Sequence, residues 1–421
     1  MKKGILVFCL VLCGLSQAAA ELFLRDILNG ADGGKMKDPN AGYYNLKVGP
    51  VLVRMNAGVN SRYSDNINLA TVNREEDLVT TPNFGIGASW QLTGLNTLNF
   101  NVSMGYSKYM NHPEADSHFA LMGFGQTGGT GISMKVVVDD FVFTPRTNIT
   151  YGQDASDSLR DNGKLATSYG RFNWVTGMDV VWNLANPIIT MGYDHVEFFS
   201  INDDFEFVDY DGERFRGNAA FKVTDTITTG VEANGGMTGF RKKYQNDNWF
   251  VHMGPFYSMQ LTNFLSFRLG AGGSIMGFDK GGSNGDGNTE FTGGYFNGSI
   301  HHMLNQNITH DLSGGRTTDL NVASNFIESY YMKYNITLGG VGGMFKNITV
   351  SPMTYLDFGQ ESNGISDPES FMRYTLGLSF GYRISEKLSS SLTYTYTGKE
   401  SNGRDRNYFA NQVSLNLGYS F

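Results

Sequence analysis

The last residues of the chain, 407-NYFANQVSLNLGYSF-421, alternate between two kinds of side chain. The odd positions carry Phe409, Val413, Leu415, Leu417, Tyr419 and Phe421. Most of the even positions carry Gln, Ser, Asn or Gly. A period of two is typical of a β-strand whose two faces meet different surroundings. Because the alternation runs to the final residue, one face of this strand must have an apolar neighbour along its whole length.

The same alternation recurs along the chain, for example in residues 98–106, 249–261, 372–384 and 388–398. Runs of this kind are longer than the strands of about 5–6 residues that are usual in soluble domains. A tilted strand that crosses a membrane needs about 9–11 residues. The lengths therefore favour strands that span a membrane.

The N-terminus has the pattern of a secretory signal peptide, predicted at residues 1–20. Lys2 and Lys3 precede an apolar run over 5–15, and small residues at 18–20 offer a cleavage site. The apolar run is shorter than the roughly 20 residues of a transmembrane helix. We therefore expect an exported chain with a cleaved signal.

Cleavage after residue 20 would remove both cysteines, Cys9 and Cys13, and leave 401 of the 421 residues. The loss of Lys2 and Lys3 lowers the basic residues from 32 to 30 against 40 acidic ones, which is a net charge of −10. An acidic chain of this kind argues against a nucleic-acid partner. No disulfide can stabilise the mature protein.

The composition favours a large β-structure. Glycine occurs 53 times, aromatic residues make up 13% and proline occurs only 9 times. No helix-length apolar run follows the signal, which excludes a helical membrane protein. Many short strands rich in Gly, Thr and aromatic residues suit a β-barrel or an array of β-sandwiches.

The connections between the runs alternate between tight and long. The tight turns are 93–96, 185–187, 224–226, 262–264, 305–307 and 385–387. The long polar connections are 61–77, 152–167, 200–213, 279–290, 359–370 and 398–407. This pattern is typical of a transmembrane antiparallel β-barrel with short periplasmic turns and long extracellular loops. We predict one barrel over residues 43–421, preceded by a short periplasmic segment at 21–42.

The strand pattern predicts about 18 strands, with 16 as the alternative. The uncertainty lies in 111–151, where 116–125 and 131–151 are each read as one strand. The irregular stretch 111–131 is also the candidate for a loop that folds into the lumen. Aromatic residues near strand ends predict the girdles of a barrel in lipid, a feature that a soluble β-sandwich would not need. They are Trp90, Trp174, Trp182, Trp249, Tyr382 and Tyr394.

The alternation also assigns charged residues to the lumen. The predicted pore-lining residues are Arg268, Arg373, Arg383, Lys222, Lys333, Asp179, Asp194 and Glu232. Mixed charges on the walls of a channel can select solutes. Two alternatives stay open, namely that these residues pair and fill the lumen, or that they line a wide pore and discriminate little.

The sequence offers no convincing catalytic or metal site. His310 and Ser313 are three apart, and His301 and His302 are adjacent, so the members of each pair point to opposite faces of a strand. No acidic residue is expected to orient these histidines. The acidic pairs 139–140 and 203–204 are expected to be solvated, and the loop 279–290 departs from a calcium-binding pattern. We expect no enzyme, no cofactor and no metal.

The final strand resembles the C-terminal assembly signal of Gram-negative outer-membrane proteins. Leu415, Leu417, Tyr419 and Phe421 carry the resemblance, whereas Asn416 stands where glycine is frequent. The resemblance implies insertion into the bacterial outer membrane by the barrel assembly machinery.

Residues 56–90 and 98–110 together resemble the opening of a family of β-barrel porins that is assigned largely by architecture. The corner Tyr63-Ser64-Asp65-Asn66 and the later pair Tyr106 and Tyr109 carry the resemblance. It implies a porin-like fold and location, and some relatives are linked to exopolysaccharide export.

Three functions are compatible with these observations. The first is a passive channel for small hydrophilic solutes in the outer membrane, with membrane lipid as its surroundings. The second is the barrel component of an exopolysaccharide export apparatus. The third is a surface structural or adhesive barrel without an open pore. The sequence leaves open whether the protein is a monomer or a homo-oligomer.

Overall fold

The computed structural model describes most of the chain after the first 43 residues. The described residues are 44–121, 130–152, 170–201, 203–242, 246–279, 290–320, 325–340, 347–362, 368–403 and 406–421. The predicted signal peptide and the segment 21–42 lie outside these ranges, so both stay predictions.

Almost all regular structure is β. The strands are β1 (Leu46–Val48), β2 (Val51–Ser64), β3 (Asp77–Gln91), β4 (Thr97–Tyr109), β5 (Ser117–Leu121), β6 (Thr130–Val138), β7 (Phe141–Gly152), β8 (Arg171–Asn183), β9 (Ile188–Ser200), β10 (Tyr210–Lys222), β11 (Ile227–Phe240), β12 (Asn248–Thr262), β13 (Leu265–Phe278), β14 (Glu290–Asn305), β15 (Ile308–Leu320), β16 (Phe326–Gly339), β17 (Ile348–Glu361), β18 (Ser370–Arg383), β19 (Leu388–Ser401) and β20 (Tyr408–Ser420). Two 3₁₀ turns, η1 (Pro113–Ala115) and η4 (Asp203–Val208), lie in connections.

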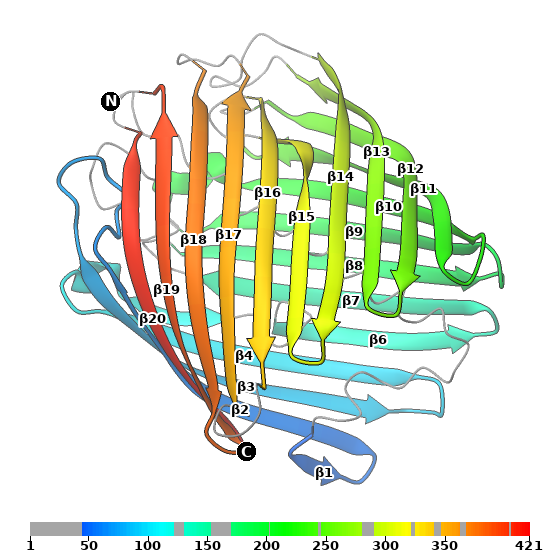
Figure 1. The fold of residues 1–421 in the computed structure, drawn as a ribbon, viewed down its shortest axis with the longest axis horizontal. Coiled ribbons are helices and arrows are strands. Elements are labelled where there is room, and N and C mark those ends of the chain that lie inside the picture. Colours follow the sequence, from blue (N-terminus) through cyan, green and yellow to red (C-terminus); the bar gives the residue numbers. More distant parts are fainter. Residues whose placement is uncertain are drawn as a thin grey trace.

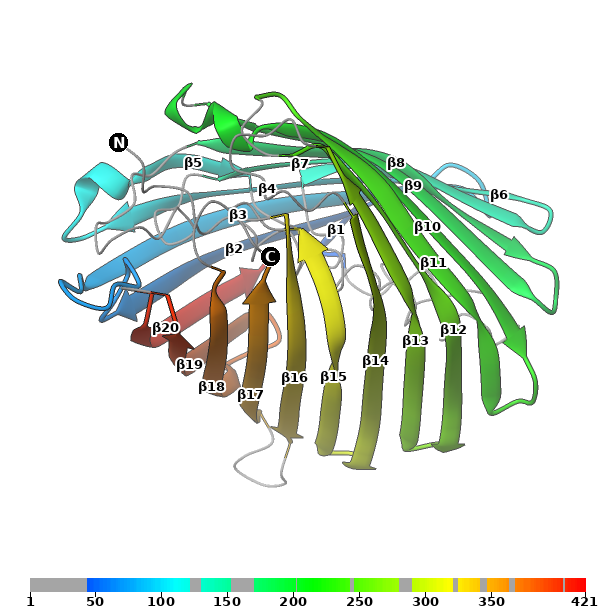
Figure 2. The ribbon, with the colours of Figure 1, turned by 90° about the horizontal axis from the view of Figure 1, so that it is seen from above.

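The strands form one antiparallel sheet that closes into a barrel. Each of them pairs with its neighbours in chain order, and β2 pairs with both β3 and β20, which joins the ends of the sheet. The short strands β5 and β6 share one place between β4 and β7, and β1 only extends the edge of β2. The barrel therefore has 18 positions, which confirms the expected number. Figures 1 and 2 show β14–β18 on one wall and β3–β8 on the opposite wall.

The stretch that was expected to be one strand, 131–151, is a hairpin of β6 and β7. Asp139 and Asp140 form its turn, and Asp139 has a φ of 50°. The prediction of an inward-folding segment at 111–131 is wrong for β5, which pairs with β4 in the barrel wall. Where β6 replaces β5 beside β4, the Thr130 hydroxyl accepts a hydrogen bond from the Ser103 N–H and donates one to the Ser103 carbonyl oxygen.

The two ends of the barrel differ as the sequence predicts. At one end the connections between strands are short, such as 184–187, 223–226 and 384–387. At the other end they are mostly longer, such as 65–76 and 201–209. Tight turns lie on the periplasmic side of outer-membrane barrels, so the end with the short connections corresponds to the periplasmic end.

One face of the wall carries large exposed apolar side chains. On β20, Leu415 and Leu417 are 50% and 45% exposed, and the same alternation holds on the other strands. Trp90, Trp182 and Tyr382 lie near the periplasmic ends of their strands, and Trp174 and Trp249 lie toward the extracellular ends. Tyr394 was expected near a strand end but lies in the middle of β19. The remaining aromatics lie at two heights, as the girdles of a lipid-embedded barrel do.

At the periplasmic end, β1 covers the part of β2 that extends beyond β20. β20 pairs with β2 over Asn56–Ser64, and β1 pairs with the earlier residues Val51–Val53. Asn45, just before β1, donates its side-chain amide to the Phe421 carbonyl oxygen and to Ser420 Oγ, the latter at 2.9 Å. The final residue is therefore tied to the start of the barrel.

The extracellular end of the same seam involves residues of the porin-like corner. The Asp65 carboxylate accepts hydrogen bonds from the backbone and side-chain amides of Asn411, at 2.7 Å and 2.6 Å. Asn66 is fully buried and donates to the Phe409 carbonyl oxygen at 2.7 Å. The corner thus ties the first loop to the last strand, which explains why short polar side chains stand there.

We expect Leu415→Arg to destabilise the barrel by about 2–4 kcal/mol, because a charge would face lipid near the middle of the membrane. Gln412→Arg is the matched control, since Gln412 lies on the opposite face of the same strand and should change stability little. Unfolding by denaturant in lipid vesicles, followed by the mobility of folded and unfolded protein on gels, measures both. Equal losses for the two variants would contradict the assignment of faces.

Candidate functional site

The polar face of the wall is the concave, inner face. Arg268 on β13 forms an ion pair with Glu232 on β11, although β12 lies between these strands. Arg146 on β7 likewise reaches Asp194 on β9 at 2.6 Å. Side chains of second-neighbour strands converge on the inside of a curved sheet and diverge on its outside. The exposed apolar residues therefore point to lipid and these ions point inward.

The pairing registers place the charged residues of β2–β20 on one face or the other. Among side chains that the structure describes, the inward basic residues are Arg54, Arg62, Lys135, Arg146, Arg171, Arg214, Arg216, Lys222, Arg268, Lys333, Arg373, Arg383 and Lys399. The inward acidic residues on the same basis are Asp77, Asp179, Asp194, Glu232, Asp311, Asp357 and Glu361. The inner wall is thus richer in basic side chains, although the whole chain is acidic.

All eight residues selected from the sequence lie on this inner face. Arg268, Arg373, Asp179, Asp194 and Glu232 are held in ion pairs. Their role in lining a conduction path stays a prediction.

The other three selected residues are more exposed. Lys222 lies at the periplasmic end of β10, 3.2 Å from Asp225 in the adjacent turn. Arg383 and Lys333 are exposed, and neither forms an ion pair within the described ranges.

Four inward residues on β7–β10 form a closed ring of charges. Arg146 and Arg216 each bind both Asp179 and Asp194. The nitrogen–oxygen distance is 2.6 Å between Arg146 and Asp194 and 2.8 Å between Arg216 and Asp179. Guanidinium groups suit such an arrangement because their planar forks can serve two carboxylates at once. The ring has no net charge and joins four neighbouring strands.

Two glycines make room for this ring. Asp194 lies directly opposite Gly177, and Asp179 lies directly opposite Gly192. A Cβ on Gly177 would overlap Asp194 Oδ1 and the Tyr193 carbonyl oxygen. The repeated Gly-x-Asp pattern, at 177–179 and 192–194, therefore pairs each carboxylate with a gap on the next strand.

A second inward pair lies on β11 and β13. Arg268 binds Glu232, and its guanidinium carbon lies 4.2 Å from the centre of the Phe256 ring. Arg268 and Glu232 are only 15% and 18% exposed. The stacking ring and the carboxylate hold this cation against the wall.

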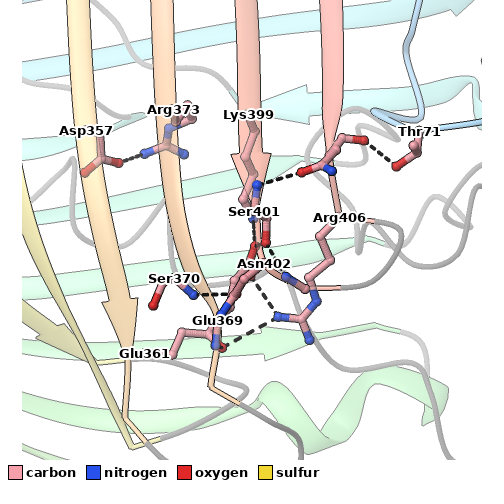
Figure 3. A network of polar contacts seen from close by, with 12 residues as sticks. Thr71, Asp357, Glu361, Glu369, Ser370, Arg373, Lys399, Ser401, Asn402 and Arg406 are labelled. Atoms are coloured by element: carbon pink, nitrogen blue, oxygen red, sulfur yellow. Dashed lines mark hydrogen bonds and ion pairs between the residues drawn. The ribbon is translucent and has the colours of Figure 1, made fainter.

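A third network lies at the extracellular end of β17–β20 (Figure 3). Arg373 binds Asp357 on the neighbouring strand. Glu369 accepts contacts from Lys399 at 2.5 Å, Arg406 at 2.8 Å and Ser401 Oγ at 2.6 Å. Because Arg406 precedes β20 and Glu369 precedes β18, this network ties two extracellular connections together.

The electrostatic balance at Glu369, which lies outside the membrane-spanning strands, favours its ionised form. Burial by itself would raise the pKa of this carboxyl. The charge of Lys399 and the hydrogen bonds from Lys399 and Ser401 outweigh burial and lower the pKa below its ordinary value of 4.5. The carboxylate therefore stabilises the network in neutral solution.

Several participants were missed from the sequence. Arg146, Arg216, Asp357 and Lys399 all lie on inward positions of alternating strands, so the period of two could have selected them. What no local pattern shows is which of them meet, because that depends on the register between strands.

The histidines differ from expectation in one respect. His301 faces inward, and its Nδ1 lies 2.7 Å from the Asp311 carboxylate on the next strand, so the expectation that no acid orients it was wrong. His310 faces outward and binds the Tyr334 hydroxyl at 2.8 Å. His301 and His302 do point to opposite faces. Asp139 and Asp140 form a turn, and Asp203 begins η4.

Within the described residues, no group of three or more His, Cys, Asp or Glu side chains is arranged to hold a metal ion. Most of the loop 279–290 lies outside those residues. In the same described part, none of the helices has the length and apolar character to cross a membrane.

A closed barrel of 18 antiparallel strands, apolar outside and charged inside, has the architecture of an outer-membrane porin. Solved structures share this architecture, and three of them serve as examples. OccK5 (OpdH) of Pseudomonas aeruginosa has a TM-score of 0.50 at 12% identity, over 88% of this chain and 98% of that chain. OccAB3 of Acinetobacter baumannii has a TM-score of 0.51 at 12% identity, over 88% and 99%. OccK8 (OprE) of Pseudomonas aeruginosa has a TM-score of 0.51 at 10% identity, over 88% and 98%.

These neighbours are outer-membrane porins, and at such identities the similarity shows the fold. A scan against protein-family models finds no match, and no curated protein matches the chain. The expected resemblance to porins is thus confirmed at the level of the fold. The chain is a closed β-barrel of porin architecture, with an apolar outer face.

We expect Gly177→Ala to destabilise the barrel by about 1–3 kcal/mol, because the added methyl group would displace Asp194 from the ring or push the neighbouring strand away. Gly217→Ala is the matched control, since a Cβ there would have no atom within 4 Å. Its effect should be small. Denaturant unfolding measures both, and an unchanged Gly177→Ala variant would contradict the packed geometry of the ring.

The Glu369 network should weaken in acid. Since the folded-state pKa lies below the unfolded value, its stabilisation is present at pH values above about 4.5 and is lost as the pH falls through the folded pKa. The protection factors of the Ser370 and Asn402 amides, which correct the exchange rates for their intrinsic pH dependence, should therefore fall as the pH is lowered through the folded pKa. Glu369→Gln should lower protection at neutral pH by about 1–3 kcal/mol and remove this acid-dependent step. Glu400→Gln, on the outer face of β19, is the control and should leave both unchanged.

Proposed function

We propose that the protein is a passive channel for small hydrophilic solutes across the bacterial outer membrane. The single observation that supports this most is the closed cylinder of 18 positions, with exposed apolar side chains outside and charged ones inside. Cylinders of 16–18 strands are wide enough to leave an aqueous channel, whereas those of about eight strands are filled by side chains. The porin neighbours support the same function.

The dimensions support a role for the inner charges in conduction. Strands about 4.8 Å apart and tilted by about 40° give a backbone diameter of about 35 Å for this number of positions. Side chains on opposite walls of such a cylinder cannot meet, so charges pair with near neighbours on their own wall. We infer that the eight inward residues selected from the sequence line the conduction path, with Arg383 and Lys333 the most available to a passing ion.

We also propose that the barrel assembly machinery inserts the chain through its last strand. Leu415, Leu417 and Tyr419 on β20 and Phe421 directly after it form an outward stripe, between 40% and 50% exposed. A chain must present this stripe before β20 pairs with β2. Membrane lipid then covers it in the finished barrel.

Purified protein in planar lipid bilayers should give stepwise single-channel currents. Arg383→Glu should shift the reversal potential in a salt gradient toward greater cation permeability, because it reverses a charge on the inner wall. Arg373→Glu should shift it in the same direction and also break the pair with Asp357. Glu400→Lys, which changes a charge on the outer face, is the matched control. An absence of current steps would contradict the channel, and an unchanged reversal potential in both arginine variants would remove these residues from the conduction path.

A further inference from the structure

The outer face of β16–β19 carries a groove at its extracellular end, with a volume of about 600 Å³. Most residues that line the groove have even numbers, whereas inward residues of these strands, such as Asp357 and Arg373, have odd ones. Each of the four strands has 14 residues, more than the roughly 9–11 that a tilted strand needs to cross a membrane. The groove therefore lies on the lipid-facing side, at the height of the headgroups.

Two rows of outward side chains form the groove. The row nearer the middle of the membrane is apolar, with Tyr330 on β16 directly opposite Phe358 on β17, and each of them is 49% exposed. The row nearer the outside is polar, and it places Glu328, Gln360 and Ser370 side by side on β16, β17 and β18. A ligand of this groove must therefore be apolar on one side and form hydrogen bonds on the other.

The wall behind the groove is packed. The Ser370 N–H donates a hydrogen bond to Asn402 Oδ1 at 2.8 Å (Figure 3). On the inner face, the Phe371 ring covers Gly359, where an added Cβ would overlap it. The network of Glu369 holds the same strand ends together. The two rows thus keep their spacing, which lowers the cost of ordering side chains when a ligand binds.

The charges around the groove disfavour a phosphate as the recognised group. Arg316 on β15 already binds Glu328 at 2.9 Å and lies 5.8 Å from the centre of the Tyr330 ring. At the other end, on β19, Glu400 is exposed and would repel an anion. Between them Gln360 is exposed, and its amide makes no hydrogen bond within the described residues. A side-chain amide can both donate and accept, so it suits a neutral partner that does the same.

We propose that this groove binds the sugar headgroup of a glycolipid in the outer leaflet of the membrane. A sugar ring has apolar C–H groups, which pack on the rings of Tyr330 and Phe358, and hydroxyl groups, which bond to Gln360, Ser370 and Glu328. Acyl chains then continue from the sugar along the apolar outer face. The inference rests on the proposed location in the outer membrane, and it does not need an open pore.

The test compares lipid A with cardiolipin as ligands of the purified protein in detergent. Both lipids carry two phosphates and several acyl chains, but only lipid A has sugar rings. Native mass spectrometry measures the fraction of barrels that retain one lipid molecule, and a titration gives an apparent Kd for each lipid. Lipid A should bind about tenfold more tightly, the equivalent of one to two net hydrogen bonds. Equal affinities would contradict recognition of the sugar.

Two variants and a control locate the site. Gln360→Ala should weaken lipid A binding about fivefold, the equivalent of one net hydrogen bond, and should leave cardiolipin binding unchanged. Phe358→Ala should weaken lipid A binding by a similar factor, because it removes an aromatic surface from the groove. Phe215→Ala is the matched control, since Phe215 is an outward phenylalanine of 48% exposure on β10. It should change neither affinity. Gel mobility before and after boiling verifies that each variant is folded.

The outcomes separate the glycolipid site from the channel. If the protein conducts in phospholipid bilayers but binds lipid A and cardiolipin equally, the channel stands and the site is wrong. If it binds lipid A selectively but gives no current, the site stands and the channel is wrong. If Phe215→Ala weakens lipid A binding as much as Phe358→Ala does, lipid A binds elsewhere on the outer face and the assignment to this groove fails.

Discussion

The structure depends on the pairing of β2 with β20. Lipid offers no hydrogen-bond partner to a backbone N–H or C=O group, so a sheet within it must have no free edge. Nine cross-strand pairs, from Asn56 to Ser64, join the first long strand to the last. β1 and Asn45 complete this seam at the periplasmic end, and Asp65 and Asn66 complete it at the extracellular end. Closure gives every strand a convex and a concave side, and thereby decides which of its faces points to lipid and which points to the lumen.

The interior follows from the same geometry. A cylinder of this width keeps opposite walls apart, so each inward charge must find its counterion among near neighbours or remain in water. The ring of Arg146, Arg216, Asp179 and Asp194 needs the gaps at Gly177 and Gly192 to form. Partly buried pairs of this kind often add little net stability, because desolvation of the ions offsets their attraction. Their consequence here is that the inward charges of β7–β10 are matched within the wall itself.

The architecture could be predicted from the sequence, because the alternation of side chains indicates that one face of each strand meets apolar surroundings and the other meets water. Tight and long connections, the signal-like N-terminus and the apolar stripe of the last strand each indicated an outer-membrane barrel, and the count of alternating runs gave about 18 strands. The hairpin of β6 and β7 was missed because apolar residues stand on both sides of Asp139 and Asp140, which left no clear break in the pattern. The expected number was still correct, since β5 and β6 fill a single place in the wall.

What the sequence determined by itself is the face on which each side chain lies, because a strand has a period of two and the two faces meet lipid and water. That is why Arg268, Arg373 and Asp179 could be assigned inward from the sequence. Only the tertiary structure decided which inward residues meet. The contact of Arg146 with Asp194, and of His301 with Asp311, depends on the registers and curvature of several strands. Register is a relation between strands far apart in the chain, and no local pattern of residues contains it.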